Sequence, residues 1–441
     1  MMSPHHPDIH LLETAYGPHL LFVDGSRLYA INHDLQQRLE ATLRQAPEQA
    51  LTLLAEHGLA VQPYVDSLPL RDPPVRALSL AVAQQCNLGC TYCYAQGGSF
   101  GGVAKAMPWS MAEAAVHRLL AEARAGERVH LAFLGGEPLT NRALIVRTTE
   151  LAAQLAAARG VQIGFAITTN GTLLTAEDGV FFARYGFAVT VSLDGIGKVH
   201  DRLRPFKGGL GSYRQILARV QPLLAHHPQL QIAARVTVTP ANLDLPTALA
   251  HFIALGFHSV GFAPMLASPG GHDALAAPDL QRLLQEMLAC GRACEAHLLA
   301  GRPYPFANLT SALQEIHRGT HRPYPCGAGA GYFGVSADGG LFACHRFVND
   351  PAGQLGTVDA GVNRQQQRLW LTTRHVHTQE PCRSCWARYL CGGGCYHEVQ
   401  YRGRPACDFI RGWLHYCLQA YIRLIEQRPE WFTPGTPSCR P

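Results

Sequence analysis

Short apolar runs and amphipathic segments alternate along the middle of the chain, from Arg76 to about Met265. This alternation is typical of parallel βα units, in which a buried strand is followed by a helix with one apolar face. It predicts strands at residues 77–83, 129–134, 162–168, 188–193, 232–238 and 259–264. Six such units are too few to close an eight-stranded barrel, and ligands of these folds bind at the carboxyl ends of the strands.

A smaller α+β module precedes this region. The pattern predicts two strands and two short helices, at residues 19–23, 27–31, 33–43 and 48–57. Asp24-Gly25 is a hairpin turn signal between the strands, and the Pro-rich segment 69–74 is typical of a linker. The module either caps the main domain or captures an unstructured peptide on a strand edge.

Charge and length exclude several classes of protein. At 441 residues the chain is long enough for two to four domains, and its formal net charge is only +5 with both signs interspersed. The polar segment from Met1 to His10 lacks the features of a signal peptide, and no apolar run is long enough to span a bilayer. We therefore expect a cytoplasmic protein that binds neither nucleic acid nor a membrane.

The cysteines are clustered in the sequence, which indicates metal or redox chemistry. Ten of the 14 cysteines fall into three groups, at residues 86–93, 326–344 and 382–407, which favours metal or redox use over disulfides. Cys86, Cys90 and Cys93, spaced C-x3-C-x2-C, come just after the first predicted strand. A 4Fe-4S cluster normally takes four cysteines, so a three-cysteine loop leaves one iron open to a small molecule. A zinc knuckle is the alternative.

The three cysteines, with Tyr92 before the third, resemble the C-x3-C-x-aromatic-C signature of the radical S-adenosylmethionine (radical SAM) enzymes. In that family the open iron chelates the amino and carboxylate groups of SAM. Electron transfer from the cluster then cleaves SAM to a 5'-deoxyadenosyl radical, which abstracts a substrate hydrogen. The resemblance implies an α/β fold with a partial (β/α)6 TIM-like barrel.

Further motifs follow the next predicted strands. Gly135-Gly136-Glu137-Pro138 looks like the family's G-G-E-P motif, which binds the SAM ammonium group, and Thr169-Asn170-Gly171 resembles its T-N-G segment beside SAM. Ser192-Leu193-Asp194-Gly195 suits ribose or carboxylate, and Arg204 resembles the arginine that pairs with the SAM carboxylate. Taken alone, each glycine-containing motif could be a plain turn, and Arg204 could be a surface residue. The occurrence of all of them at consecutive strand ends is hard to reconcile with chance. The implied cofactor-binding residues are Tyr92, Gly135, Gly136, Glu137, Pro138, Thr169, Asn170, Ser192, Asp194 and Arg204.

The C-terminal third resembles the SPASM domain, an extension of radical SAM enzymes that carries two auxiliary 4Fe-4S clusters. All seven cysteine positions are matched, by Cys326, Cys344, Cys382, Cys385, Cys391, Cys395 and Cys407. The resemblance implies one cluster on Cys382, Cys385, Cys391 and Cys407, and another on Cys326, Cys344 and Cys395. Together with the cluster on Cys86, Cys90 and Cys93, this makes three 4Fe-4S clusters. A tetrahedral zinc site on four of the C-terminal cysteines is the structural alternative.

The cluster on Cys326, Cys344 and Cys395 lacks an evident fourth protein ligand. Either its open iron faces the substrate, or a distant cysteine completes it. The candidates for a distant ligand are Cys290, Cys294, Cys417 and Cys439.

SPASM radical SAM enzymes typically modify peptides or proteins. The resemblance therefore implies a maturase that cross-links a ribosomally made precursor peptide through a C-C, C-S or C-O bond, with a flavodoxin or ferredoxin as electron donor. The alternative is a sulfatase-type maturase that oxidises Cys or Ser to formylglycine. In that group an acidic base follows the second SPASM cysteine, whereas here the residue is His345, which can accept a proton or hydrogen-bond a cluster sulfur. A non-enzymatic zinc scaffold is the third alternative.

These observations predict three domains. Residues 1–72 form the N-terminal hairpin-plus-helices module, with precursor-peptide recognition as its candidate role. Residues 73–300 form the radical SAM partial barrel. Residues 301–441 form a bridging segment and the SPASM domain.

Overall fold

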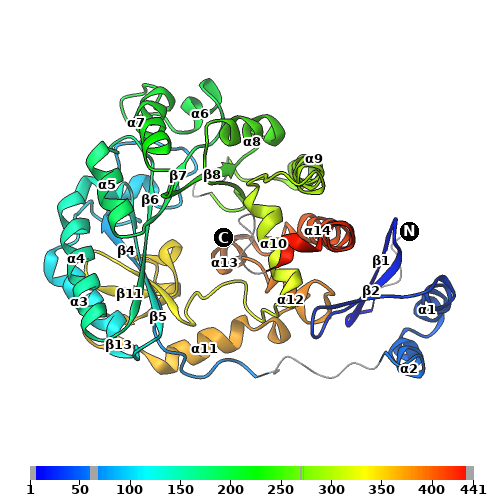
Figure 1. Cartoon of the computed structure of the whole chain (residues 1–441). Helices are drawn as coiled ribbons and strands as arrows, with labels where there is room; N and C mark the ends of the chain where they lie inside the picture. Colours follow the sequence, from blue (N-terminus) through cyan, green and yellow to red (C-terminus); the bar gives the residue numbers. More distant parts are fainter. Residues whose placement is uncertain (1–5, 60–67, 269–270, 272, 434–441) are drawn as a thin grey trace. The chain divides into compact units, whose positions relative to one another are not determined.

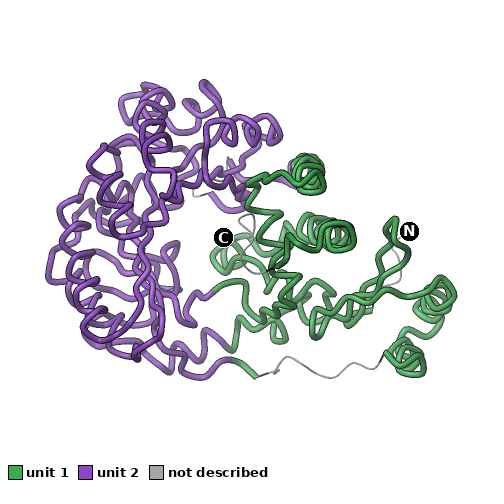
Figure 2. The backbone as a smooth tube through the Cα atoms, in the orientation of Figure 1, with its two compact units in different colours: residues 1–69, 283–326, 372–441 green, residues 70–282, 327–371 purple. Residues whose placement is uncertain are grey.

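The computed structural model describes residues 6–59, 68–268, 271 and 273–433. The chain divides into two compact units, coloured separately in Figure 2. Unit 1 combines residues 1–69, 283–326 and 372–441, and unit 2 combines residues 70–282 and 327–371. In the described part of the chain, no helix has the length and apolar character needed to cross a membrane.

Unit 2 is built on six parallel strands that pair in chain order. They are β4 (Ala77–Ala83), β5 (Arg128–Gly135), β6 (Gln162–Thr169), β7 (Ala188–Ser192), β8 (Gln231–Val238) and β9 (Ser259–Pro264). All six agree with the predicted strands to within one residue at each end. The α/β fold class predicted from the hydrophobic pattern is confirmed.

Four short strands from later in the chain extend this sheet beyond β4. They are β10 (Tyr332–Val335), β11 (Gly340–Phe342), β12 (Gln354–Thr357) and β13 (Gly361–Val362). β10 pairs in parallel with β4, and the others follow as an antiparallel meander. The sheet therefore has ten strands, and its last four are too short to leave a clear periodic pattern in the sequence.

Helices between the parallel strands lie along the outer side of the sheet (Figure 1). They are α3 (Trp109–Ala121), α4 (Arg142–Ala158), α5 (Ala176–Arg184), α6 (Lys198–Leu203), α7 (Tyr213–His226) and α8 (Leu245–Ala254). Each of the longer helices buries an apolar stripe, as α3 does with Val116 and Leu119, which are fully buried. Because helices cover the sheet, strand side chains on the covered face are apolar, and Phe133 of β5 is fully buried.

Unit 1 contains a three-stranded antiparallel sheet, β1 (Ile9–Thr14), β2 (Gly17–Phe22) and β3 (Arg27–Ala30), followed by α1 (His33–Gln45) and α2 (Ala50–Glu56). Leu20, Leu39 and Leu54 form the buried centre of this module. The predicted hairpin and both helices are present. β1 was not predicted, because its polar start hides the alternation that makes Ile9 and Leu12 buried.

The remainder of unit 1 is helical. It contains α10 (Ala307–His317), α12 (Arg388–Cys391), α13 (Tyr396–Arg402), α14 (Cys407–Gln427) and most of α9 (Ala277–Leu299). The buried carboxylate of Glu295 on α9 accepts hydrogen bonds from the Tyr416 hydroxyl (2.9 Å) and Arg423 Nη2 (2.9 Å) on α14. A buried charge needs such partners, so this contact ties the two helices together.

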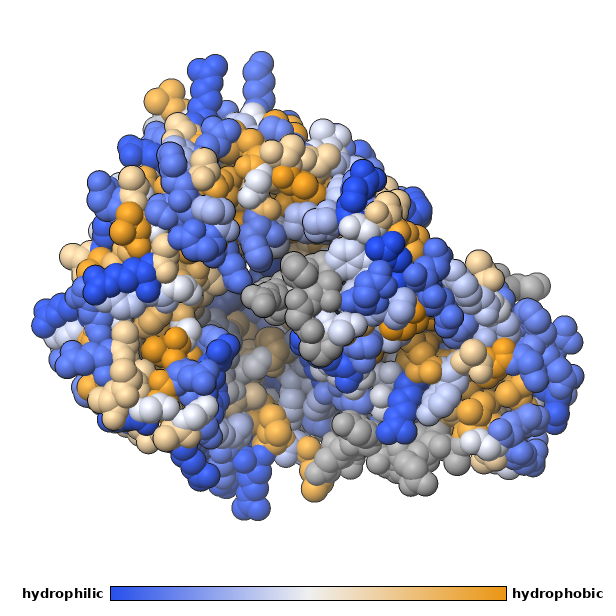
Figure 3. Space-filling view, viewed as in Figure 1, coloured by the Kyte–Doolittle hydropathy of each residue, from blue (hydrophilic) through white to orange (hydrophobic). Residues whose placement is uncertain are grey.

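On the face drawn in Figure 3, hydrophobic and hydrophilic residues are interspersed. The large apolar side chains that are exposed come from separate parts of the chain: Tyr16, Leu68, Leu70, Val103, Val180, Leu210, Leu369 and Tyr401. Single exposed apolar residues are normal on folded proteins and do not by themselves indicate a binding surface.

The close approach of three backbone segments at Gly136 gives a stability prediction. A Cβ atom added there would lie 2.2 Å from the Gln85 carbonyl oxygen and 2.8 Å from the Gly98 Cα atom. We expect Gly136→Ala to lower the free energy of unfolding by about 1–3 kcal/mol, because the clash is with backbone and not with a mobile side chain. Urea denaturation of the metal-free protein, followed by circular dichroism, measures this change.

Gly208→Ala is the matched control. A Cβ atom at Gly208 meets nothing within 4 Å, and its backbone does not require positive φ. Its free energy of unfolding should stay within about 0.5 kcal/mol of the parent's. Equal free energies of unfolding for the Gly136 and Gly208 variants would contradict the close approach of the backbone segments at Gly136.

Candidate functional site

The loop after β4 brings three cysteine thiols into electrostatic contact. Burial raises the pKa of Cys86, and Cys93 raises it further. Burial also raises the pKa of Cys90 to about 11, with Arg204 opposing and both other thiols adding to the rise. Burial thus favours the neutral thiols of Cys86 and Cys90, and a bound metal would favour the thiolates by supplying positive charge.

A single metal ion would need a tighter arrangement. Among the residues that the structure describes, no group of three or more His, Cys, Asp or Glu side chains is placed to hold one ion. In a cubane cluster each thiolate binds a different iron, so its sulfurs lie farther apart than the ligands of one zinc ion.

The cysteine loop is paired with the segment that follows Arg204. Leu88 and Phe206 form an antiparallel β-bridge. Gly89 N donates to the Pro205 carbonyl (2.8 Å), and Lys207 N donates to the Asn87 carbonyl (3.1 Å). These backbone bonds hold Arg204 beside the loop, although more than a hundred residues separate the two in sequence.

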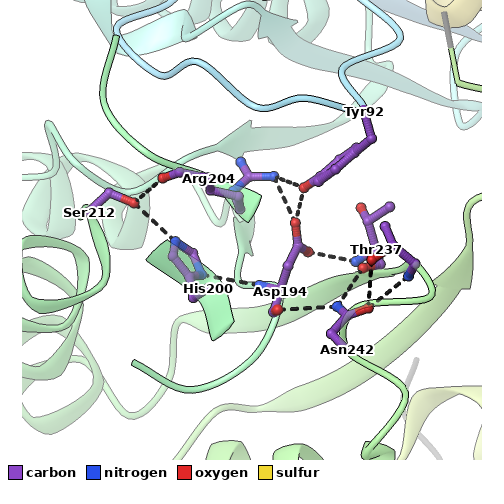
Figure 4. A network of polar contacts seen from close by, with 8 residues as sticks. Tyr92, Asp194, His200, Arg204, Ser212, Thr237 and Asn242 are labelled. Atoms are coloured by element: carbon purple, nitrogen blue, oxygen red, sulfur yellow. Dashed lines mark hydrogen bonds and ion pairs between the residues drawn. The ribbon is translucent and has the colours of Figure 1, made fainter. Parts of the chain in front are cut away.

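A buried ion network joins three of the predicted residues (Figure 4). Asp194 is fully buried, and its Oδ2 accepts bonds from the Tyr92 hydroxyl and from Arg204 Nη1 (3.3 Å). Arg204 Nη1 also donates to the Tyr92 oxygen (2.7 Å), and Thr237 N donates to Asp194 Oδ1 (2.7 Å). Burial raises the pKa of Asp194, but Arg204 and the hydrogen bonds oppose that rise. The carboxyl group of Asp194 is thus paired with a guanidinium in a buried site.

Arg204 keeps an open donor. Its Nε atom is buried and has no hydrogen-bond partner in the described part of the chain. Buried donors are normally satisfied, and the planar guanidinium can offer Nε together with Nη2 to a carboxylate. The arrangement fits a missing anionic ligand, as the sequence predicted for the SAM carboxylate.

A neutral histidine connects the backbone on both sides of this network (Figure 4). His200 is fully buried; its Nδ1 accepts from Asp194 N (3.2 Å), which leaves the ring proton on Nε2 to face Ser212 Oγ (3.1 Å). Ser212 Oγ in turn donates to the Arg204 carbonyl (2.6 Å). Burial, with Arg204 adding, lowers the pKa of His200 to about 3. The sequence analysis did not identify His200 or Ser212, because neither lies in a recognisable motif.

Glu137 links the ends of β5 and β6. It is fully buried, and its carboxylate accepts from Leu139 N (3.0 Å), Thr169 Oγ1 (2.7 Å) and Asn170 N (2.7 Å). Burial raises the pKa of Glu137, and these bonds lower it. Pro138 begins the 3-10 turn η3 (Pro138–Asn141), and the adjoining glycines allow the close backbone approach described above. Ser192 ends β7 and is half-buried.

Four cysteines in unit 1 also gather. Burial raises the pKa of Cys382 to about 11, and Cys391, Cys407 and Cys385 contribute to that rise while Arg404 opposes it. This is the set predicted for one auxiliary cluster. Cys391 ends the short helix α12, and Cys407 begins the long helix α14.

The second predicted auxiliary set is divided between the units. Cys326 and Cys395 both lie in unit 1. Burial is the main cause that raises the pKa of Tyr396, and both cysteines add to this rise. Cys344 lies in unit 2 and precedes η4 (His345–Phe347). Of the distant candidates for a fourth ligand, Cys290, Cys294 and Cys417 are fully buried, as expected of small apolar residues, and Cys439 is outside the described residues.

The candidate base His345 lies among aromatic residues of unit 2. Its Nδ1 is hydrogen-bonded to the Tyr332 hydroxyl (2.7 Å). Its ring also contacts the Tyr94 ring edge-on, with centroids 5.8 Å apart. Tyr94 directly follows Cys93, so this contact connects the first cysteine loop to the residue after Cys344.

The low pKa of His200 predicts a pH dependence of stability. The pKa falls from 6.5 in the unfolded chain to about 3 in the fold, so the unfolded state binds the extra proton at intermediate pH. Stability is therefore complete above about pH 6.5 and falls as the pH drops toward 3, by up to about 1.4 kcal/mol per unit. Urea denaturation at pH 7.5 and pH 5.5 should show a larger loss for the parent than for His200→Asn. An equal loss in both proteins would contradict a buried neutral imidazole.

Sequence comparisons relate this chain to known proteins. The family model of the radical SAM superfamily matches residues 80–226. A serine-type anaerobic sulfatase-maturating enzyme of Bacteroides thetaiotaomicron is 29% identical over 379 residues, which cover 78% of this chain and 88% of that protein. A second such enzyme, from Klebsiella pneumoniae, is 25% identical over 341 residues, covering 74% and 83%.

Solved structures share the fold. Native anSMEcpe with bound AdoMet superposes with a TM-score of 0.68 at 19% identity, covering 80% of this chain and all (100%) of that one. Streptococcus suis SuiB bound to the precursor peptide SuiA gives a TM-score of 0.52 at 15% identity, covering 92% and 98%. Residues 80–226 of this chain therefore form a radical SAM domain, and the chain shares its fold with both of these structures.

Proposed function

We propose that this enzyme cross-links a side chain of a ribosomally made precursor peptide. The observation that carries the proposal is the pairing of the cysteine loop with the Arg204 segment, which leaves a buried arginine donor open beside three thiols. Relatives named as sulfatase-maturating enzymes and a fold shared with a peptide-bound maturase support a peptide or protein substrate.

The residues of the site have distinct proposed roles. Cys86, Cys90 and Cys93 would hold the cluster, and Arg204 would bind the SAM carboxylate through Nε and Nη2. Glu137 retains acceptor capacity on Oε2, which receives one donor, and would bind the ammonium group. When bound, the cluster and SAM would supply the 5'-deoxyadenosyl radical that removes a hydrogen atom from the peptide.

Cross-link formation also releases a proton and an electron from the peptide. His345 is the proposed proton acceptor, since an imidazole titrates near neutral pH and Tyr332 holds its ring in place. The C-terminal cysteines would hold auxiliary clusters, whose chemistry suits them to take up one electron. A flavodoxin or ferredoxin would supply the reducing electron that starts the reaction.

The N-terminal sheet is the proposed recognition element for the precursor. β3 pairs with β2 along one edge, and no described strand pairs with its other edge. An extended peptide can add to such an edge through main-chain hydrogen bonds.

Formylglycine formation is the second candidate function, because several relatives carry the name of sulfatase-maturating enzymes. Both reactions begin with hydrogen abstraction, so the radical SAM site serves either. They differ in the product: formylglycine has a free aldehyde, and a cross-link has none.

Cluster binding predicts loss of SAM cleavage in a cysteine variant. We expect anaerobically reconstituted protein to contain iron and sulfide and to release 5'-deoxyadenosine from SAM in the presence of dithionite. The combined variant Cys86→Ala, Cys90→Ala and Cys93→Ala should release none. Gly208→Ala, whose added Cβ atom meets nothing within 4 Å, should behave as the parent. Equal release from parent and triple variant, or zinc in place of iron, would end the proposal.

The role of His345 predicts a selective defect. With a precursor peptide as substrate, His345→Gln should still release 5'-deoxyadenosine but form modified peptide about 10²–10⁴-fold more slowly, because the proton acceptor is lost. Tyr332→Phe should show a smaller defect, since the imidazole remains. Mass spectrometry should find a peptide two hydrogens lighter that does not react with an aminooxy reagent. A reactive aldehyde would favour formylglycine formation, and unchanged yield in His345→Gln would exclude His345 as the base.

A further inference from the structure

Three polar side chains beside Cys86 form a closed ring of hydrogen bonds. Asn170 Nδ2 donates to Asn87 Oδ1 (2.8 Å), Asn87 Nδ2 donates to Thr172 Oγ1 (2.8 Å), and Thr172 Oγ1 donates to Asn170 Oδ1 (2.7 Å). Asn170 is 4% exposed and Thr172 is fully buried. Asn87 belongs to the cysteine loop, whereas the other two follow β6, so the ring connects two strand ends.

A backbone donor determines how the ring is oriented. Thr172 N donates to Asn170 Oδ1 (2.9 Å), so that atom must be the carbonyl oxygen of the amide. The Nδ2 group of Asn170 then faces the loop, where it donates to Asn87 Oδ1 and to the Cys86 sulfur at 3.7 Å. Asn87 is oriented in turn, because its oxygen must accept from Asn170. No alternative assignment of the amides satisfies all these contacts.

We propose that Asn170 is a positioning residue for Cys86, and that its amide raises the reduction potential of the cluster which Cys86 would hold. The inference rests on the proposed radical SAM site but concerns a contact that the reaction itself does not require. Cys86 Sγ also accepts from Leu88 N at 3.4 Å, so a backbone donor and a side-chain donor converge on one sulfur.

The direction of the effect follows from charge. Reduction adds one electron to the cluster and increases the negative charge on its sulfurs. A hydrogen-bond donor stabilises the more negative state more strongly, and donors to sulfur are an established determinant of cluster potential. The buried amide acts in low dielectric and keeps its orientation through the ring. Removing it should therefore make the cluster harder to reduce.

The experiment is an electron paramagnetic resonance titration of the reconstituted holoenzyme. Dithionite supplies the electrons, and the signal that changes when SAM is added identifies the cluster on Cys86, Cys90 and Cys93. We expect Asn170→Leu to lower the equilibrium constant for reduction by up to about tenfold, which is about 59 mV for one electron. Thr172→Val keeps the Asn170 donor but opens the ring, and should produce a smaller shift in the same direction.

Asn141→Leu is the control. Its side-chain amide also donates to two backbone carbonyls, of Val82 (2.9 Å) and Met107 (3.3 Å), but to no sulfur. It should lose stability without shifting the potential. Should Asn170→Leu fail to fold, the Thr172→Val shift tests the same contact.

The possible results distinguish failure of the inference on Asn170 from failure of the proposed function. A SAM-responsive signal with the parent potential in both Asn170→Leu and Thr172→Val would overturn the inference and leave the proposed function standing. Equal shifts in all three variants would also overturn it, because they would indicate general loosening. The absence of any SAM-responsive signal in the parent would overturn the inference together with the proposed function.

Discussion

The site depends on a buried carboxylate. Asp194 is fully buried at the end of β7, where an unpaired charge would cost several kcal/mol. Its bonds to Tyr92, Arg204 and the Thr237 backbone come from three different parts of the chain. Because the carboxylate requires all of these donors, satisfying it also brings the cysteine loop, the arginine and β8 into one arrangement.

Two hydrogen-bond networks of uncharged side chains support the buried ion pair. His200 and Ser212 carry hydrogen bonds from the Asp194 amide to the Arg204 carbonyl, and the ring of Asn87, Asn170 and Thr172 holds the other side of the loop. Neither network introduces a charge, because burial keeps His200 unprotonated. The loop is thus held from both sides without further desolvated ions, whose burial would reduce stability.

The sequence predicted the six parallel strands because buried strands leave apolar runs and their helices leave a 3.6-residue period. It could not predict β10 to β13, which are two to four residues long and join the sheet beside β4 from more than 240 residues away. The predicted residues Tyr92, Asp194 and Arg204 do meet. Among the cysteines, Cys93 raises the pKa of both Cys86 and Cys90. The roles of all six residues stay predictions. His200 and Ser212 were missed because their importance comes from tertiary contacts that no local spacing encodes.

The charged side chains at the strand ends match the charges of SAM. Asp194 is paired with Arg204, whereas every hydrogen-bond donor to Glu137 is a neutral amide or hydroxyl. With both carboxyl groups ionised, these three side chains carry one net negative charge in a buried setting. SAM has a carboxylate, an ammonium and a sulfonium, and so carries one net positive charge. Its carboxylate would satisfy the open Nε donor of Arg204, and its cationic groups would offset Glu137, so a single ligand would complete both the hydrogen bonding and the charge of the site.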